Sequence, residues 1–478
     1  MKPNNPNNNL KLKKIHFIGI GGIGMSALAR YFYSQGLQIS GSDKEDSYMI
    51  TELKKEGIRE IWTPQNKEKI RAHNPDYIIY TTAINKDNEE LSWAKENNKT
   101  ILHRSEMLET AIGQKRLISV SGTHGKTTTT AMIAQMLLDH DLNPSVILGG
   151  ILKNENTNAI SGSGEYFLIE ADESDRSHLK GNPEIAIITS IEADHLENYS
   201  NDFNEIKKSF IEFSKKAILN QGIIVCFDDK NTREIISDNF NINDKKIITY
   251  GTGKNSKDLK IFADFNSDLN SWDIFKDSKH ITSLKLKIPG KHNILNSLAA
   301  FATGILIGLS PKNIKHSLER YEGVKRRFEI IFKSKDLTII DDYAHHPTEI
   351  SATISAAKEL NPHRLIIILQ PHQPTRLQDL WEDFVNVFRT EESLVFITET
   401  YIARGKGIEG ITTKKLVDEI NKPNIKYLPG SIEQIATHLE KVIKSNDLIL
   451  IMGAGDITTL GKALLSHYKT LAEVFGNN

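Results

Sequence analysis

Cysteine is almost missing from this chain: Cys226 is the only one among its 478 residues. A single cysteine can form neither an internal disulfide nor a cysteine-rich zinc site. The sequence therefore excludes a disulfide-stapled scaffold and favours a protein of the reducing cytoplasm.

Long apolar runs and an excess of one charge are missing too. No segment approaches the roughly 20 apolar residues of a membrane span. The first nine residues form a polar tail without the apolar region of a secretory leader. Lys and Arg number 60 against 61 Asp and Glu, which gives a net charge of -1. We therefore expect no membrane insertion, no secretion and no general attraction to nucleic acid.

What the chain does contain is a strand, a glycine turn and a helix in succession. Residues 117–120 have the pattern of a buried strand, and residues 131–138 that of an apolar-faced helix; between them lie Gly122, Thr123, His124, Gly125, Lys126, Thr127 and Thr128. Such a loop holds phosphate oxygens with backbone N–H groups, while a lysine neutralises charge and a hydroxyl ligates Mg²⁺. Val120 stands where the strict phosphate-loop motif has its first glycine. The pattern predicts a nucleoside triphosphate site, and an ordinary strand-turn-helix is the alternative.

A second glycine turn lies near the start of the chain. Gly19, Gly21 and Gly24 separate a strand pattern from a helix pattern, and Asp43 ends the next strand. This arrangement predicts nucleotide binding, with tight helix–strand packing as the alternative. The glycines do not distinguish a dinucleotide from a UDP-sugar.

Acidic and histidine side chains follow two further strand patterns. Glu170 begins the acidic segment 170–175, and His195 comes shortly after the strand at 185–189. Carboxylates at the carboxyl edge of a sheet suit Mg²⁺, which also takes phosphate oxygens. The alternatives are a solvated acidic loop and a structural histidine.

Several later clusters also combine polar groups. Asn293 and Asn296 are three residues apart at a helix start, where they can read an adenine edge or cap the helix. Arg327, the second of two consecutive arginines, suits a γ-phosphate if it is not an ordinary surface residue. Residues 341–347 mix acidic, aromatic and imidazole groups, and Arg376 is a candidate partner for a carboxylate.

The alternation of strand and helix patterns predicts an α/β protein of three domains. We expect a Rossmann-like domain at 1–113, a central P-loop-type ATPase domain at 114–325 and a C-terminal Rossmann-like domain at 326–478. The central domain should combine a parallel sheet with a small antiparallel annex at 259–288.

In kind and order, these motifs resemble those of the Mur ligases, the ATP-dependent enzymes that build the peptide of bacterial cell-wall precursors. The resemblance covers almost the whole chain and rests on residues 19–26, 122–127, 170–175, 192–195, 292–296, 326–329, 341–349 and 453–457.

The resemblance implies one substrate site in each domain. The first glycine turn would hold the diphosphate of a UDP-sugar, not NAD, with Gly19, Gly21, Gly22, Gly24, Met25, Ser42 and Asp43 around it. ATP and Mg²⁺ would be held by Lys126 on the phosphates, Thr127 and Glu170 on one ion, His195 on a second, Asn293 and Asn296 near the adenine, Arg327 on a phosphate and Asp342 on the ribose. His345 would lie close to the reacting centre, with His372 and Arg376 on the carboxylate of the amino acid.

Three positions distinguish this chain within the resemblance. Ser190 stands where the family usually has Asn, and Gln373 takes a place often held by Arg. The stretch near Phe210 lacks the lysine that related ligases carbamylate, as in the alanine-adding branch.

The resemblance implies that a muramate carboxylate attacks the γ-phosphate of ATP, and that the amine of L-alanine then displaces phosphate from the acyl phosphate. Lys126, Glu170, His195, Arg327 and His345 would form the catalytic set, with His345 as the candidate base. The expected partners are UDP-N-acetylmuramate and L-alanine, and the expected state is a monomer or weak homodimer. The alternatives are a recycling ligase that attaches a murein tripeptide to the same sugar, a nicotinamide-dependent oxidoreductase, and a nucleotide-regulated binding protein without catalysis.

Overall fold

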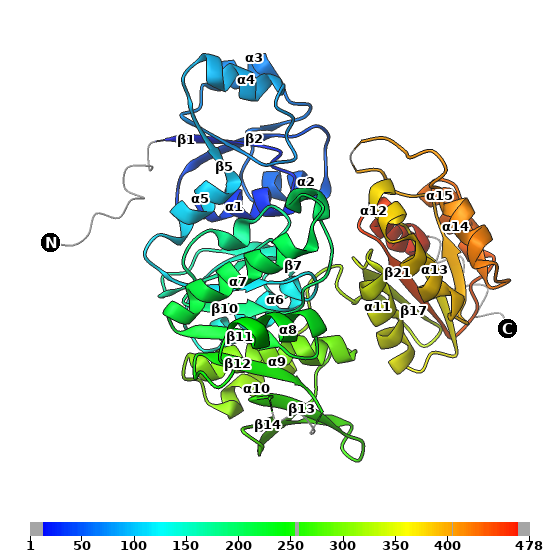
Figure 1. The fold of residues 1–478 in the computed structure, drawn as a ribbon. Helices are drawn as coiled ribbons and strands as arrows, with labels where there is room; N and C mark the ends of the chain where they lie inside the picture. The colour runs from blue at the N-terminus through cyan, green and yellow to red at the C-terminus, as the bar shows by residue number, and fades with distance from the viewer. Residues whose placement is uncertain (1–12, 254–257, 404, 467–478) are drawn as a thin grey trace. The chain divides into compact units, whose positions relative to one another are not determined.

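The computed structural model describes residues 13–253, 258–403 and 405–466. It forms two compact units, one of Met1–Leu286 with Ile294–Glu322 and the other of Lys287–Asn293 with Gly323–Asn478. Three sheets underlie a three-domain α/β architecture (Figure 1). The predicted fold class is thereby confirmed.

The first sheet is entirely parallel, with its five strands in the order β3-β2-β1-β4-β5. Its strands are β1 (Lys14–Ile18), β2 (Gln38–Ser42), β3 (Ile61–Trp62), β4 (Tyr77–Tyr80) and β5 (Thr100–His103). The helices of this domain are α1 (Ile23–Ser34), α2 (Tyr48–Lys55), α3 (Lys67–His73), α4 (Glu89–Glu96) and α5 (Arg104–Ile112). The strand order reverses between β1 and β4, and ligands of open α/β sheets bind at such a switch point.

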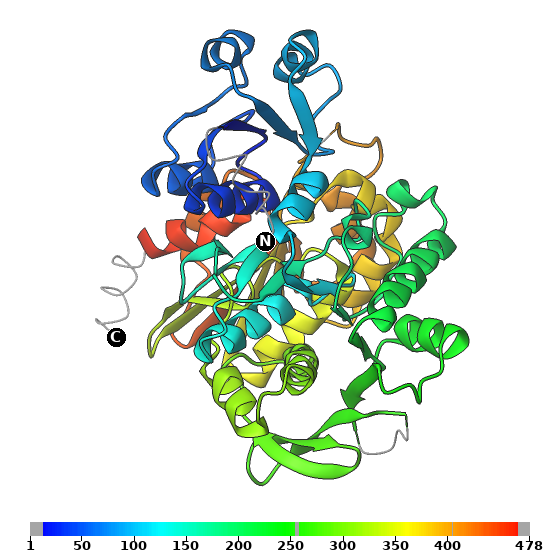
Figure 2. The same cartoon turned by 90° about the vertical axis from the view of Figure 1, so that its left-hand side faces the viewer.

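The second sheet has ten strands in the order β15-β14-β13-β12-β11-β10-β6-β9-β7-β8. Its strands are β6 (Arg116–Ser121), β7 (Ser145–Leu152), β8 (Thr157–Ile160), β9 (Tyr166–Glu170), β10 (Ile185–Ile188), β11 (Gly222–Cys226), β12 (Ile247–Thr252), β13 (Ile261–Asn266), β14 (Ser271–Lys276) and β15 (Lys279–Leu284). The pairs from β13 to β7 are parallel, and antiparallel partners extend both edges. The strands β13 to β15, green in Figure 2, form the predicted annex.

The helical elements between and after these strands are α6 (Lys126–Asp139), η2 (Ser177–Leu179), η3 (Leu196–Tyr199), α7 (Phe203–Leu219), α8 (Lys230–Asn239), α9 (Lys291–Leu306) and α10 (Pro311–Arg320). In α6, Ala131, Met132, Ile133 and Ala134 are all fully buried. A helix that is apolar all round lies inside a large core. The phosphate loop that precedes α6 is therefore fixed to a rigid element.

The third sheet has six strands in the order β16-β17-β21-β18-β19-β20, and only β16 is antiparallel. Its strands are β16 (Glu329–Lys333), β17 (Leu337–Asp342), β18 (Arg364–Leu369), β19 (Leu394–Ile397), β20 (Ile425–Tyr427) and β21 (Asp447–Met452). Its helices are α11 (Pro347–Glu359), α12 (Pro374–Asp379), α13 (Trp381–Arg389), α14 (Thr413–Ile420), α15 (Ile432–Glu440) and η4 (Asp456–Thr459).

The first two sheets share a hydrophobic core. One cluster of buried side chains joins Phe17 and Phe32 of the first domain to Phe167 and Ile169 of β9. The ring of Tyr31 lies 5.4 Å from that of Phe167. This continuity explains why the two domains form one compact unit. Among the described residues, no helix combines the length and apolarity needed to cross a membrane.

Candidate active site

The predicted phosphate loop lies between β6 and α6 and is held by the neighbouring loop after β10. Gly122 has a φ of +133° and Gly125 a φ of +82°, which L side chains rarely adopt. The carbonyl oxygen of Ser190 accepts the N–H of Thr123 at 2.9 Å, and its hydroxyl oxygen accepts the N–H of His124 at 2.9 Å. A side chain of the usual size at Gly122 would collide with the backbone of Ser190. The unexpected Ser190 thus has a structural role in the loop.

Lys126 reaches back across this loop. Its Nζ donates to the carbonyl oxygens of Gly122 at 2.5 Å and Thr123 at 3.1 Å, and it lies 2.9 Å from the carboxylate of Glu173. Burial disfavours the charged form of Lys126, but Glu173 and the acidic side chains beside it outweigh burial and raise its pKa. The lysine is therefore held as a cation against the backbone of the predicted phosphate loop.

Thr127 and Glu170 are brought together, as the sequence predicted. The Thr127 hydroxyl donates to Glu170 Oε1 at 2.9 Å, and the N–H of Gly149 donates to Oε2 at 2.8 Å. Strand β6 lies between β9 and β10, so the loops after all three strands emerge at one edge of the sheet. A hydroxyl and a carboxylate are hard oxygen ligands and match the preference of Mg²⁺.

His195 lies on the loop after β10, at the same edge. Its φ is +56°, and its Nε2 and Nδ1 lie 3.6 Å from Asp194 and 3.7 Å from Glu197. Both ring nitrogens of His195 therefore face carboxylates of its own loop. Phe210 is fully buried in α7, where its ring lies 5.2 Å from that of His178.

The two predicted adenine-region amides have different neighbours. The hydroxyl of Thr129 donates to Asn296 Oδ1 at 3.2 Å, and this amide also lies against Gly125. Asn293 Nδ2 donates to the carbonyl oxygen of Pro289 at 2.6 Å. Asn296 thus supports the phosphate loop, and Thr128 is buried in the first turn of α6.

The first-domain glycine turn closes on Ser42 and Asp43. The N–H of Gly19, whose φ is +83°, donates to the carbonyl oxygen of Ser42 at 2.8 Å. The N–H of Gly21 donates to Asp43 Oδ2 at 2.8 Å, and the N–H of Gly22 donates back to Gly19 at 3.1 Å. Met25 is buried on α1, and Gly24, the second residue of that helix, lies beneath the guanidinium of Arg104.

The Ser42 side chain belongs to a buried polar network that the sequence did not reveal. Its hydroxyl donates to Glu90, which also accepts Trp62 Nε1–H at 2.7 Å and lies 3.5 Å from His16. Burial opposes ionisation of Glu90, but His16 and the hydrogen bonds outweigh it and lower the Glu90 pKa. The hydroxyl of Ser42 therefore serves this network, and its carbonyl shapes the turn.

In the C-terminal domain, Asp342 organises the arginine pair. Its carboxylate accepts the N–H groups of Phe328 at 2.6 Å and Ala344 at 2.7 Å. Burial raises the Asp342 pKa, and the charge of Arg327 opposes that shift. Arg327 Nη1 lies 3.8 Å from Glu349, and its guanidinium stacks 5.1 Å from the ring of Tyr343.

The three predicted amino-acid contacts come together at the carboxyl edge of the third sheet. The rings of His345 and His372 lie 5.5 Å apart, and Arg376 Nη1 lies 3.5 Å from His372 Nδ1. His345 Nδ1 lies 2.9 Å from the carbonyl oxygen of Tyr343, which can only accept. Nδ1 therefore carries the proton, and Nε2 carries the lone pair. Burial lowers the pKa of His345 to about 3. Gln373, at the place often held by Arg, has an amide and no guanidinium. Its Oε1 accepts the N–H of Ala403 at 3.0 Å.

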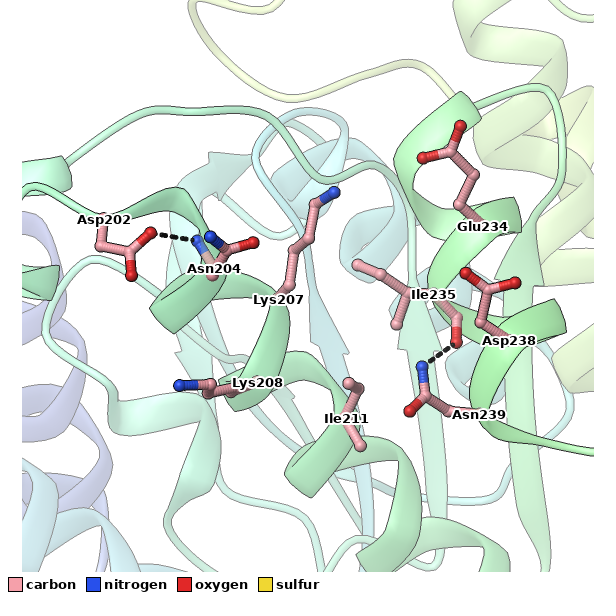
Figure 3. Close-up of a pocket in the computed structure, with 9 residues that line it drawn as sticks. All are labelled: Asp202, Asn204, Lys207, Lys208, Ile211, Glu234, Ile235, Asp238 and Asn239. Carbon is pink, nitrogen blue, oxygen red and sulfur yellow. Dashed lines mark hydrogen bonds between the residues drawn. The ribbon is translucent and has the colours of Figure 1, made fainter.

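A groove between α7 and α8 is separate from these clusters (Figure 3). It is lined by Asp202, Asn204, Lys207, Lys208, Ile211, Glu234, Ile235, Asp238 and Asn239. None of the predicted site residues belongs to it. Its mixture of lysines and carboxylates defines no single ligand chemistry.

Fold and site together define a three-domain α/β enzyme whose central sheet carries a phosphate loop beside a Thr–Glu pair. Residues 14–116 match the sequence model of the Mur ligase family, catalytic domain, residues 120–304 the Mur ligase middle domain, and residues 326–455 the Mur ligase, glutamate ligase domain. The chain belongs to the Mur ligase family, which confirms the resemblance.

Relatives that match nearly the full length are identical to this chain at about two residues in five. The UDP-N-acetylmuramate–L-alanine ligase of Clostridium tetani is 41% identical over 456 residues, covering 95% of this chain and 98% of the relative. That of Buchnera aphidicola subsp. Acyrthosiphon pisum (strain Tuc7) is 40% identical over 469 residues, covering 95% of both.

Solved structures share the fold. The UDP-N-acetylmuramate–alanine ligase of Thermotoga maritima has a TM-score of 0.80 and 30% identity, covering 96% of this chain and 99% of the other. A murein peptide ligase of Psychrobacter arcticus has a TM-score of 0.70 and 22% identity, covering 95% and 98%, and shows the common fold alone.

Proposed function

We propose that this enzyme joins L-alanine to the carboxylate of UDP-N-acetylmuramate at the expense of ATP, as the first peptide step of peptidoglycan precursor synthesis in the cytoplasm. The observation that carries the proposal is the contact of Lys126 and Thr127 with Glu173 and Glu170 around the phosphate loop. Relatives named for this reaction, up to 41% identical over most of the chain, support the choice of substrates.

The first task of these residues is to position the γ-phosphate of ATP. Lys126 turns from the carbonyl oxygens of its loop to the phosphate oxygens, and the N–H groups at the start of α6 bind the same anion. Because Ser190 and α6 fix the loop backbone, those N–H groups need no rearrangement as charge moves. The muramate carboxylate attacks the γ-phosphorus, ADP leaves, and an acyl phosphate forms.

Thr127 and Glu170 would hold one Mg²⁺ ion, and His195 would hold a second. The ions would neutralise negative charge on the phosphates. Arg327 contacts a phosphate and Asp342 the ribose in this proposal, while Asn293 and Asn296 face the adenine region. The first glycine turn holds the UDP diphosphate. These assignments keep the division at 1–113, 114–325 and 326–478.

The second task is delivery of the amine. We assign the alanine carboxylate to Arg376 and His372, beside the Nε2 lone pair of His345. The amine attacks the acyl carbon and passes a proton to Nε2 of His345, the tetrahedral intermediate collapses, and phosphate leaves. Orientation of this kind can supply on the order of 7–11 kcal/mol of the barrier. The proposed assembly is a monomer or weak homodimer.

The test measures phosphate release and the mass of the product with ATP and UDP-N-acetylmuramate. We expect turnover with L-alanine and far less with a murein tripeptide; the reverse preference would identify a recycling ligase. Lys126→Ala should abolish alanine-dependent turnover while the fold survives. Lys216→Ala is the matched control, because Lys216 makes the same two kinds of contact. Its Nζ lies 2.6 Å from the carbonyl oxygen of Leu179 and 3.3 Å from the carboxylate of Glu212. Full turnover by Lys126→Ala would refute the proposed ATP site.

A further inference from the structure

Arg104, at the start of α5, lies directly over the first-domain glycine turn. A Cβ atom built on Gly24 would lie 2.4 Å from its Nη1, so a side chain there would displace the guanidinium from the start of α1. The other terminal nitrogen of the guanidinium contacts the central domain: Nη2 lies 2.6 Å from Asp175 and 3.8 Å from Asp172. One side chain therefore touches both the glycine turn and the acidic loop.

This position is electrostatically costly unless an anion is present. The N-terminus of a helix carries a partial positive charge, so a cation beside it is disfavoured. In this structure Asp175 and Asp172 supply the compensating charge, and Asp175 is only 8% exposed. A diphosphate at the glycine turn would offer Arg104 a stronger, bidentate partner and would compete with these carboxylates.

The acidic loop, residues 170–175, connects the contact with Arg104 to the contact with Lys126. Asp175 Oδ1 accepts the N–H of Ser177 at 2.9 Å, and Asp172 Oδ1 accepts that of Ser174 at 2.9 Å. Glu173 lies within the turn from Asp172 to Ser174, and its carboxylate lies 2.9 Å from Lys126 Nζ. Hydrogen bonds thus fix both parts of the loop, and only Ser174 separates Asp175 from Glu173 along the chain.

Asp172 lies beside the two cations along the loop. Arg104 Nη2 lies 3.8 Å from its carboxylate, and Lys126 Nζ lies 2.9 Å from the carboxylate of the next residue, Glu173. When Arg104 turns to a diphosphate, Asp172 and Asp175 lose the cation that lies beside them. The loop then attracts positive charge more strongly, which favours the divalent cation that accompanies a nucleoside triphosphate.

We propose that Arg104 is a positioning residue that couples occupancy of the first-domain glycine turn to nucleotide binding at the phosphate loop. The inference rests on the proposed function, because it takes the ligand of the turn to be a UDP-sugar. UDP-N-acetylmuramate should tighten triphosphate binding, and by linkage the triphosphate should tighten UDP-sugar binding by the same factor.

The experiment measures Kd of AMP-PNP with Mg²⁺ by calorimetry on the full chain, without and with saturating UDP-N-acetylmuramate. We expect a ratio of at least about fivefold for the unchanged protein, the lower end of typical coupling. Arg104→Met should reduce the ratio below about twofold, and Arg104→Lys should restore it only in part, because lysine cannot bridge two anions with a planar fork.

Two further variants separate coupling from stability. Arg104→Met combined with Asp175→Asn removes both charges and avoids an unpaired carboxylate, so it keeps the test open if the single variant unfolds. Arg116→Met is the matched control, since Arg116 makes a 2.5 Å ion pair with Glu184 in the same unit. It should keep the full ratio, and a merely structural role of Arg104 would change the melting temperature without changing the ratio.

Each outcome decides a separate claim. The coupling would be overturned if the folded Arg104→Met variant kept the Kd ratio of the unchanged protein. It would also be overturned if UDP-N-acetylmuramate left the AMP-PNP Kd of the unchanged protein the same although product forms. Either result would leave the proposed function standing. Failure of the unchanged protein to bind UDP-N-acetylmuramate would overturn the proposed function, and the inference with it.

Discussion

Replacing Gly122 by alanine should damage nucleotide binding more than it damages the fold. At a φ of +133°, a non-glycine residue is strained by roughly 1–3 kcal/mol. The new Cβ would also lie 2.8 Å from the carbonyl oxygen and 2.9 Å from the nitrogen of Ser190, and backbone cannot rotate away. Ser190 must therefore shift.

The shift of Ser190 sets the magnitude. Ser190 accepts the N–H groups of Thr123 and His124, and each such hydrogen bond contributes roughly 0.5–1.5 kcal/mol. Strain and lost bonds together amount to roughly 2–6 kcal/mol. Because Ser190 fixes the backbone that leads into the start of α6, where the N–H groups proposed to bind phosphate lie, we expect at least a tenfold weaker Kd for AMP-PNP, since about 1.4 kcal/mol is one factor of ten.

Gly308 provides the control for strain alone. Its φ is +88°, and no atom lies within 4 Å of a Cβ built there. Gly308→Ala should therefore lower the melting temperature by a few degrees and leave AMP-PNP affinity within about twofold of the original. Calorimetric titration and thermal denaturation of both variants measure the two effects. Equal AMP-PNP affinity in Gly122→Ala and the unchanged protein would refute the reasoning.

Three further predictions concern single charged or titratable groups. Glu170→Gln keeps the shape of the Thr127 contact but removes its charge, so kcat should fall by about 10²–10³ and the Mg²⁺ requirement should rise, whereas Glu184→Gln should change neither in steady-state assays. His345 has a pKa of about 3, so His345→Gln should lower kcat/KM without moving any acid limb between about pH 5 and 8; a shifted limb would contradict this. The Glu90 pKa is lowered in the folded protein, so its ionised form stabilises the fold above the unfolded pKa of about 4.3, and this stabilisation is lost as pH falls through the folded value. Glu90→Gln should therefore lower the melting temperature at pH 7, and the gap should narrow below about pH 4; a constant gap would exclude the mechanism.

The sequence predicted those parts of the site that follow continuous patterns. The strand, glycine turn and helix around Lys126 are contiguous, so local periodicity located them. Glu170 could be placed beside Thr127 because both follow parallel strands, and the carboxyl ends of such strands share an edge. The same rule brought His345, His372 and Arg376 together.

Contacts between distant segments escaped prediction. Arg104 and Asp175 are 71 residues apart in sequence and lie in different domains, and no local pattern links them. Glu90 lies in the first turn of α4, and it is fully buried against Ser42, 48 residues away. The short strands β8 and β20 also lacked an apolar run. They lie at sheet edges, where pairing with a neighbour rather than burial on both faces makes the strand.

Asp43 gives the structural argument against the oxidoreductase alternative. In nicotinamide-binding domains, the acidic residue after the second strand accepts hydroxyl groups of the ribose. Here one carboxylate oxygen of Asp43 accepts the N–H of Gly21 at 2.8 Å and the other that of Lys44 at 2.7 Å. The carboxylate thus closes the glycine turn, and the guanidinium of Arg104 lies over Gly24. Backbone N–H groups already engage the acidic residue, and a cation lies beside the turn, so these contacts favour the proposed phosphate ligand over a ribose.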